Sequence, residues 1–206
     1  MNDSRLQQTI ATLADYYNSC KVGYVGHEGY RKSTDLAKFG TCIDELVRLG
    51  LIDPNRTLFL DLGCADGRVN VLMSYFVKRS VGIEIDPEIL AEFSPRKKEL
   101  THRLQSEDLI QPPDNILLFN GNSLEATTYE HIENTINVRF EEIDLFYTYI
   151  TLHDLFAAKI AEEAKPKALY LVYGFSKILP RYQGLELLIP DVASQGIVAL
   201  YGKRTS

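Results

Sequence analysis

The chain has 206 residues, 45% of them hydrophobic and 24% charged, which fits one globular domain. The formal net charge of −6 argues against general nucleic-acid binding, which relies on basic residues that neutralise phosphates. No apolar run approaches the roughly 18 residues of a membrane span, and the opening residues do not resemble a secretory signal. Three cysteines without a C-x-x-C pair fit neither a disulfide framework nor a zinc site, so we expect a cytoplasmic protein without a metal.

The first 52 residues predict a helical layer interrupted by an irregular loop. Apolar residues recur at helical spacing over about 4–19, behind the cap candidates Asp3 and Ser4. A second helix is expected behind Ser33, with one apolar stripe that stops at Gly50. Between the two helices, KVGYVGHEGYRKS is too rich in glycine and too irregular to predict a helix or a strand.

From Thr57 onward, strand-like and helix-like segments alternate. The apolar runs that predict strands are 57–62, 80–85, 116–120, 142–150 and 168–175. The helices predicted between them are 68–78, one that starts at Pro87, and 153–164. Because the apolar runs are continuous rather than alternating, we expect strands covered on both faces, as in a parallel sheet with flanking helices.

The tail of the chain has a different pattern. Segments 185–190 and 196–202 are joined by the short turn DVASQ, which predicts an antiparallel hairpin at one edge of the sheet. The expected fold class is therefore α/β, with a doubly wound, mostly parallel sheet, an antiparallel C-terminal hairpin and N-terminal helices. We expect a single domain over 1–206, made of the helical layer and covering loop at 1–52 and a Rossmann-like core at 57–206.

The first predicted strand ends in a glycine turn, DLGCADG at 61–67. In open α/β sheets, ligands lie outside the carboxyl ends of the strands, and glycine lets a ligand approach the main chain closely. The third glycine of the dinucleotide pattern G-x-G-x-x-G is missing, because Arg68 stands in its place.

The acids at this turn indicate what kind of ligand it holds. Asp61 would repel a pyrophosphate but attract a cation, and Glu84, which closes the next strand, can accept hydrogen bonds from both hydroxyls of a ribose. A ribose and a positive charge without a phosphate are features of S-adenosylmethionine. A nicotinamide site and a cofactor-free fold are the alternatives.

DLGCADG followed by VGIEID resembles motif I and the acidic motif after it in class I S-adenosylmethionine-dependent methyltransferases. The predicted order of strands and helices is similar to that fold from Thr57 to about Phe175, and the tail hairpin resembles the family's last two strands. The resemblance implies S-adenosylmethionine as the cofactor and a cofactor site made of Asp61, Gly63, Ala65, Gly67, Glu84, Ile85 and Asn122.

Within this implied site, the residues from Asp61 to Gly67 would cradle the methionine part, and Glu84 would hold the ribose. Asn122 stands where the family often has an acid that contacts the adenine amine, and its amide oxygen can accept the same bond more weakly. Two features depart from the family pattern. Ala65 replaces the usual second glycine and adds a methyl group close to the cofactor, and SKILPRYQG is too short for the usual helix between the fifth and sixth strands.

The methyl acceptor is expected at the end of the fourth predicted strand, where Tyr147 and Tyr149 are the catalytic candidates. Tyrosine hydroxyls can orient an amine, and tyrosine rings can hold a cation. Because the two tyrosines alternate along a strand, at least one is expected to serve packing. Methyltransferases that modify base amines carry an Asn/Asp-Pro-Pro-Tyr/Phe motif at this place. This chain lacks the motif, which argues against a nucleic-acid acceptor.

A second resemblance concerns the N-terminal loop. YVGHEGYRKSTDLAKFGTCIDEL resembles the cofactor-covering loop and helix of the non-SET, seven-strand protein lysine methyltransferases, with Tyr24, Gly26 and Glu28 approximating their Tyr-Gly-Glu loop. It implies that Tyr24 contacts the cofactor and that a protein lysine is the acceptor, although the Asn pair of the histone enzymes is absent. The alternatives are a small-molecule methyltransferase and a cofactor-binding module without methyl transfer.

Other chemically suggestive residues have plain structural interpretations. His27 could be a base beside the cofactor or a solvated loop residue. His153 and Asp154 are expected to cap the following helix, and Cys64 is expected to pack in the turn rather than act as a nucleophile. The basic stretch 94–103 is either a solvated helix face or a docking patch for an acidic partner. The sequence does not indicate an oligomeric state.

Overall fold

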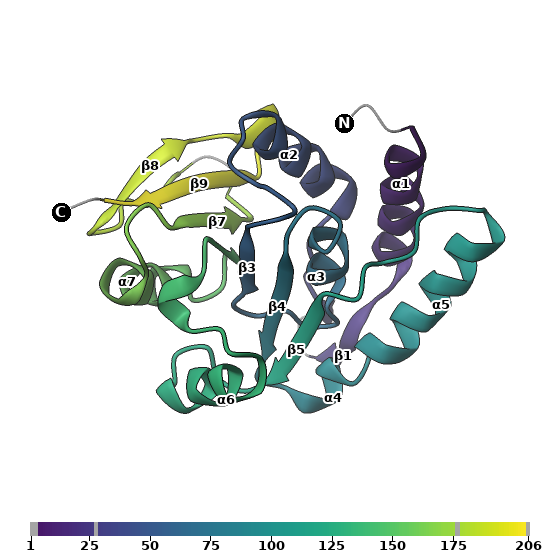
Figure 1. Ribbon diagram of the computed structural model, residues 1–206, viewed down its shortest axis with the longest axis horizontal. Coiled ribbons are helices and arrows are strands. Elements are labelled where there is room, and N and C mark those ends of the chain that lie inside the picture. The colour runs from purple at the N-terminus through teal and green to yellow at the C-terminus, as the bar shows by residue number, and fades with distance from the viewer. Residues whose placement is uncertain (1–3, 27–28, 176–177, 205–206) are drawn as a thin grey trace.

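The computed structural model describes residues 4–26, 29–175 and 178–204, and only the backbone of 24–26 and 29–31. The cap candidate Asp3 and the loop residue His27 lie outside this part of the chain. The described residues form a seven-stranded sheet, a separate two-stranded hairpin, and helices on both faces of the large sheet (Figure 1). None of the described helices is long and apolar enough to cross a membrane.

The large sheet has the strand order β5-β4-β3-β6-β7-β9-β8. The first five of these pair in parallel, and β9 runs antiparallel to both of its neighbours. This arrangement confirms the α/β class, the mostly parallel sheet and the antiparallel C-terminal hairpin. The strands are β3 Leu58–Asp61, β4 Arg79–Glu84, β5 Ile116–Asn120, β6 Leu145–Tyr149, β7 Leu169–Tyr173, β8 Leu185–Ile189 and β9 Val198–Lys203.

Two hydrophobic clusters lie on opposite faces of this sheet, and each is covered by its own helices. Successive strand residues alternate between the clusters: Phe59 and Tyr147 belong to the first, and Leu60 and Phe146 to the second. Both faces are therefore buried, which explains the continuous apolar runs. The first cluster is covered by α1 Ser4–Ser19, α2 Leu36–Arg48, α3 Arg68–Met73 and α5 Phe93–Ser106, and the second by α6 Ala126–Ile136 and α7 His153–Glu163.

The segment KVGYVGHEGYRKS was predicted to be irregular, and that prediction is wrong. It contains β1 (Val22–Gly26) and β2 (Gly29–Arg31), which pair with each other as an antiparallel hairpin outside the large sheet. Gly23 has a φ of +66°, and a side chain there would come within 3.1 Å of Ile89 in α4 (Pro87–Leu90). Backbone pairing joins the two strands, and no alternating apolar pattern in the sequence marks them.

Several element boundaries also differ from the predicted ones. Asp35, rather than Ser33, caps α2, because its carboxylate accepts the backbone N–H groups of the first turn. The predicted helix 68–78 ends at Met73, and the predicted strand 142–150 begins only at Leu145. The helix α6 was not among the predicted elements, and α5 covers the basic stretch 94–103, for which a solvated helix face was one of the two interpretations. Two short 3-10 helices complete the described chain, η1 Phe140–Glu142 and η2 Val192–Ser194.

The strand order reverses between β3 and β6, which places the switch point of the sheet there. From β3 the chain moves outward to β4 and β5, and it then returns to the other side of β3 to form β6 and β7. At such a point the connections leave in opposite directions, so a crevice opens outside the carboxyl ends of the strands. In Figure 1 the arrowheads of β4 and β5 point toward the end of the molecule where α4 and α6 lie.

Gly67 makes a specific packing demand that stability measurements can test. Gly67 and Gly50 have similar positive φ angles, +73° and +70°, but an added Cβ would lie 2.6 Å from Phe93 Cδ2 at Gly67 and would have no neighbour within 4 Å at Gly50. We expect Gly50→Ala to cost about 1 kcal/mol through the backbone alone. Gly67→Ala should cost roughly 1–3 kcal/mol more because of overpacking.

Urea unfolding of both variants measures this difference. The two slopes should match that of the wild type, so that the midpoints report free energy of unfolding directly. Equal losses at the two positions would contradict the packing argument.

Candidate functional site

A cavity of about 610 Å³ lies at the carboxyl ends of β3, β4 and β6. The glycine turn after β3 forms its floor, the ends of β4 and β5 form one side, and the end of β6 forms the other. The two ends of the β1–β2 hairpin supply a further wall through Val22, Lys32, Ser33 and Thr34. A volume of this size is typical of a site for a small ligand or cofactor.

The glycine turn leaves open space at Gly63. A Cβ at Gly63 would meet no described atom within 4 Å, and its N–H donates to Asp61 Oδ1 at 3.2 Å. Cys64 is buried beneath the turn, and its N–H donates to the carbonyl of Ile83 at 2.8 Å. Packing of the protein itself therefore does not require glycine at 63, whereas close approach of a ligand to this backbone would.

Ala65 adopts a backbone conformation that favours glycine. Its φ is +48°, in the left-handed region, which costs a residue with a Cβ about 1 kcal/mol. Its N–H donates to Glu84 Oε2 at 3.0 Å. The departure from the expected glycine thus carries a backbone cost, and the residue lines the cavity as predicted.

Glu84 joins the glycine turn to the end of β4. Its side chain is buried, and its second oxygen, Oε1, accepts the N–H of Asp86 at 3.0 Å. A buried carboxylate is stabilised by such backbone donors, and carboxylate oxygens can each accept more than one hydrogen bond. Glu84 therefore presents a fixed, oriented acceptor group to the cavity.

Asp61 is an acid in an environment that disfavours its charge. It is 1% exposed, and burial raises the pKa of its carboxyl to about 8, with further contributions from the nearby acids Glu84 and Asp66. The N–H of Gly63 acts in the opposite direction but is outweighed. A cation brought into the cavity would favour the ionised form of Asp61.

Ile85 and Asn122, which the sequence predicts to contact the cofactor, both line the cavity. Ile85 is 64% exposed, which is unusual for a large apolar side chain and suits contact with a flat ligand ring. Asn122 Oδ1 accepts the N–H of Leu124 at 3.0 Å, and its Nδ2 donates to Glu125 at 3.1 Å. These bonds fix the orientation of the amide at the start of α6.

The two tyrosines of β6 both line the cavity, but their surroundings differ. Tyr147 is 2% exposed, packs against Phe39, and shares a 2.5 Å hydrogen bond with Thr34. Burial and the neighbouring Asp61 hold the pKa of Tyr147 well above its usual value, so it stays protonated. Tyr149 is half-buried, with its ring centroid 5.3 Å from that of Tyr173.

Some predicted residues do not meet at the cavity. Gly67 does not line it and instead packs against Phe93 and Leu118. Tyr24 belongs to β1, but its side chain lies outside the described part of the structure. Cys64 is buried in the turn, as predicted, and it also lines the cavity. Among the described residues, no group of three His, Cys, Asp or Glu side chains is placed to hold a metal ion.

The predicted capping role of His153 and Asp154 is wrong. Leu152 is the N-cap residue of α7 and makes no side-chain cap hydrogen bond. The His153 ring instead shares a 2.6 Å hydrogen bond between Nδ1 and the hydroxyl of Tyr182 and packs edge-on against Phe175. This pairing joins α7 to the segment after β7, a long-range contact that local sequence rules do not anticipate.

Sequence reasoning missed the buried ionic group next to the glycine turn. Asp66 is fully buried and pairs with Arg68, which is 3% exposed, and with Arg96 of α5. Arg96 is part of the basic stretch 94–103, so that stretch is not wholly a solvated face. The only sign of this group in the sequence was Arg68 at the position of a third glycine, and it did not indicate that Asp66 and Arg96 would join it.

The comparisons with known proteins agree with this architecture. No family model and no curated protein matches the chain. Three solved structures with the same fold are an RNA methyltransferase from Salinibacter ruber in complex with S-adenosyl-L-homocysteine, a candidate methyltransferase from Escherichia coli and a candidate O-methyltransferase from Klebsiella pneumoniae.

In that order, their TM-scores are 0.50, 0.53 and 0.50, and their sequence identities are 19%, 16% and 13%. The alignments cover 80%, 89% and 100% of this chain and 91%, 97% and 92% of the other chains. The chain therefore has the Rossmann-like fold of class I S-adenosylmethionine-dependent methyltransferases.

The raised pKa of Asp61 has a consequence for stability that needs no ligand. Between about pH 4 and pH 8 the carboxyl is ionised in the unfolded chain and protonated in the folded one, so the free energy of unfolding falls as pH rises. Asp61→Asn removes this contribution. We expect the variant to gain stability relative to the wild type across this interval, at most about 1.4 kcal/mol per pH unit.

Urea unfolding of both proteins at several pH values gives the difference between them. The difference should level off above about pH 8. A difference independent of pH would mean that Asp61 is already ionised in the folded protein at low pH.

Proposed function

We propose that this protein binds S-adenosylmethionine in the cavity and transfers its methyl group to an acceptor. The observation that carries the proposal is the pair of buried acids, Asp61 and Glu84, on either side of the open backbone at Gly63. Glu84 offers the ribose hydroxyls a fixed acceptor, and Asp61 offers the cationic amino-acid part an anion that the cation itself would stabilise.

The same residues argue against a dinucleotide. A pyrophosphate brings negative charge, and it would meet two buried acids at the turn that should receive it. The α3 helix, on whose N-terminus a pyrophosphate would rest, begins with Arg68 already bonded to Asp66 and contains six residues. The remaining implied contacts are Gly63 and Ala65 for the methionine part, Ile85 against the adenine and Asn122 at its amine.

The chain contributes alignment and exclusion of water rather than acid–base groups near the acceptor. S-adenosylmethionine, when bound, supplies an electrophilic methyl group on a sulfonium. Among the described residues that line the cavity, Asp61 and Glu84 are the acids and no histidine is present. Tyr147 is held in its protonated form, so it can orient an acceptor by hydrogen bonding but cannot take a proton from it. Methyl transfer to a neutral, desolvated nucleophile requires little more.

The cavity is compatible with more than one class of methyl acceptor. The sequence suggests a protein lysine as the methyl acceptor, but the loop on which this hypothesis is based includes Glu28, which lies outside the described residues. The tyrosine-lined end of the cavity suits a small molecule equally well, since Tyr149 offers a half-buried aromatic wall. A binding module without methyl transfer is the third possibility.

Calorimetric titration tests the cofactor assignment. S-adenosylmethionine and S-adenosylhomocysteine should bind the wild type, while NADH should not. Glu84→Gln keeps one oxygen acceptor for the turn but loses the charge, and we expect it to weaken binding about tenfold, because charge-assisted hydrogen bonds are roughly twice as strong as neutral ones.

Glu99→Gln is the matched control, because Glu99 is an exposed acid bonded to Tyr16 on α1, away from the cavity. Gly63→Ala gives an independent check, since it should weaken binding without changing stability. If NADH binds, or if Glu84→Gln binds as tightly as the wild type, the assignment of the turn is wrong.

Labelled methyl transfer identifies the acceptor class. The protein is incubated with methyl-labelled S-adenosylmethionine and either the protein fraction or a protein-depleted metabolite extract of a cell lysate. The lysine hypothesis predicts label in the protein fraction, mapped to lysine after digestion. Label confined to the metabolite extract would indicate a small-molecule acceptor. Tight cofactor binding with no label in either fraction would indicate a binding module.

A further inference from the structure

A single guanidinium, that of Arg68, holds both ends of the β1–β2 hairpin. Nη2 donates to the carbonyl of Cys20, just before β1, at 3.2 Å, and Nη1 donates to Ser33 Oγ, just after β2, at 2.9 Å. These two contacts come from residues 13 positions apart, which the hairpin brings together over the first turn of α3.

The orientation of Arg68 is fixed by Asp66. Nε and Nη2 of Arg68 donate to the two oxygens of this carboxylate, each at 2.9 Å, and the guanidinium also lies 5.6 Å from the ring centre of Tyr17. Four donor contacts from one planar group leave it little freedom. Because Asp66 belongs to the glycine turn itself, Arg68 connects the hairpin directly to the backbone that would receive the cofactor.

A second arginine reinforces the first end of the hairpin. Arg96 donates to Asp66 and to the carbonyl of Lys21, and it forms an ion pair with Glu92 at 2.8 Å. Glu92 in turn accepts the N–H of Gly23 at 3.1 Å. At the second end, Ser33 accepts a hydrogen bond from Arg68. The next two residues are bonded to tyrosines of the sheet: the hydroxyls of Thr34 and Tyr147 share a hydrogen bond, and the backbone N–H of Asp35 donates to the hydroxyl of Tyr173.

Both ends of the hairpin are walls of the cavity. Val22 lines it from the first end and Ser33 from the second, and Arg68, which is 3% exposed, lines it between them. Displacing either end would open the cavity on this side. The position of the hairpin relative to the glycine turn therefore decides whether a ligand is enclosed or only rests on the sheet edge.

We infer that Arg68 is a positioning residue for cofactor binding, acting through the hairpin rather than by touching the ligand. It couples the two hairpin ends to Asp66 of the glycine turn, so that the enclosing wall is already in place before the ligand arrives. The inference rests on the proposed function in taking the enclosed ligand to be S-adenosylmethionine.

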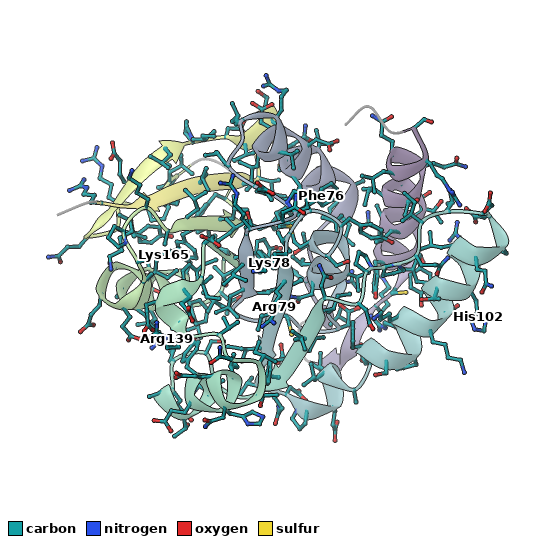
Figure 2. The ribbon with its side chains drawn as sticks, viewed as in Figure 1. Phe76, Lys78, Arg79, His102, Arg139 and Lys165 are labelled. Atoms are coloured by element: carbon teal, nitrogen blue, oxygen red, sulfur yellow. The ribbon has the colours of Figure 1, made fainter. Side chains whose placement is uncertain are left out.

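Two variants and one control separate this role from a general effect on folding. Arg68→Gln removes the ionic contact with Asp66, and Ser33→Ala removes only the contact of the second hairpin end. Arg79→Gln is the matched control. Arg79, labelled in Figure 2, also donates to a backbone carbonyl, that of Ile136, but it is the first residue of β4, whereas the cavity lies at the carboxyl end of that strand.

Hydrogen exchange of the ligand-free proteins provides the first measurement. Amides of β1 and β2 should exchange about tenfold faster in Arg68→Gln, since the variant loses charge-assisted hydrogen bonds that hold both ends of the hairpin. They should exchange several-fold faster in Ser33→Ala and at the wild-type rate in Arg79→Gln, while β7 amides stay constant in all three. Unchanged exchange of β1 and β2 in both Arg68→Gln and Ser33→Ala would overturn the inference. If Arg68→Gln does not fold, Ser33→Ala alone decides.

Calorimetric titration with two ligands provides the second measurement. S-adenosylhomocysteine carries the amino-acid part, and methylthioadenosine lacks it. Positioning through the hairpin predicts that Arg68→Gln and Ser33→Ala weaken both ligands by similar factors, about tenfold or more for Arg68→Gln. A loss confined to S-adenosylhomocysteine would overturn the inference, because it would make Arg68 a direct contact of the ligand carboxylate. If the wild type binds neither ligand, the proposed function fails, and the exchange measurement still decides whether Arg68 positions the hairpin.

Discussion

Three carboxyl groups crowd around one glycine turn with almost no access to water, and the architecture of the site depends on how each charge is managed. Asp66 is neutralised by two arginines, and Glu84 is held by backbone N–H groups. Asp61 has neither kind of compensation beyond one N–H bond, and burial raises its pKa to about 8. Of the two acids among the described residues that line the cavity, Asp61 is therefore the one whose negative charge is not compensated, and a cationic ligand would compensate it.

The core of the fold could be predicted because its signals are local. Continuous apolar runs predicted the strands β3 to β7. The glycine turn after β3 and the acids Asp61 and Glu84 at the ends of β3 and β4 predicted the site, because the carboxyl ends of parallel strands lie at one edge of the sheet. Of the predicted cofactor residues, the cavity brings together Asp61, Gly63, Ala65, Glu84, Ile85 and Asn122. Their roles toward a cofactor stay predictions.

What could not be predicted depends on contacts between distant residues. Gly67 reads as part of a ligand-binding motif, but packing with Phe93 and Leu118 explains it. In the sequence, Arg68 only appears where a dinucleotide motif would have its third glycine. In the structure its partners lie at the ends of the hairpin, whose strands carry no apolar pattern that the sequence would show. In both cases the sequence shows the residue, but the residues that it contacts are known only from the tertiary structure.

The placement of β9 has a consequence for how the protein folds. Although β9 follows β8 in sequence, it lies between β7 and β8, so these two strands do not pair with each other. Until β9 has joined the sheet during folding, the edge of β7 remains open to other chains, and β8 lacks the strand with which it pairs. Folding of this sheet therefore passes through a stage that is prone to aggregation, and the docking of one particular strand ends that stage.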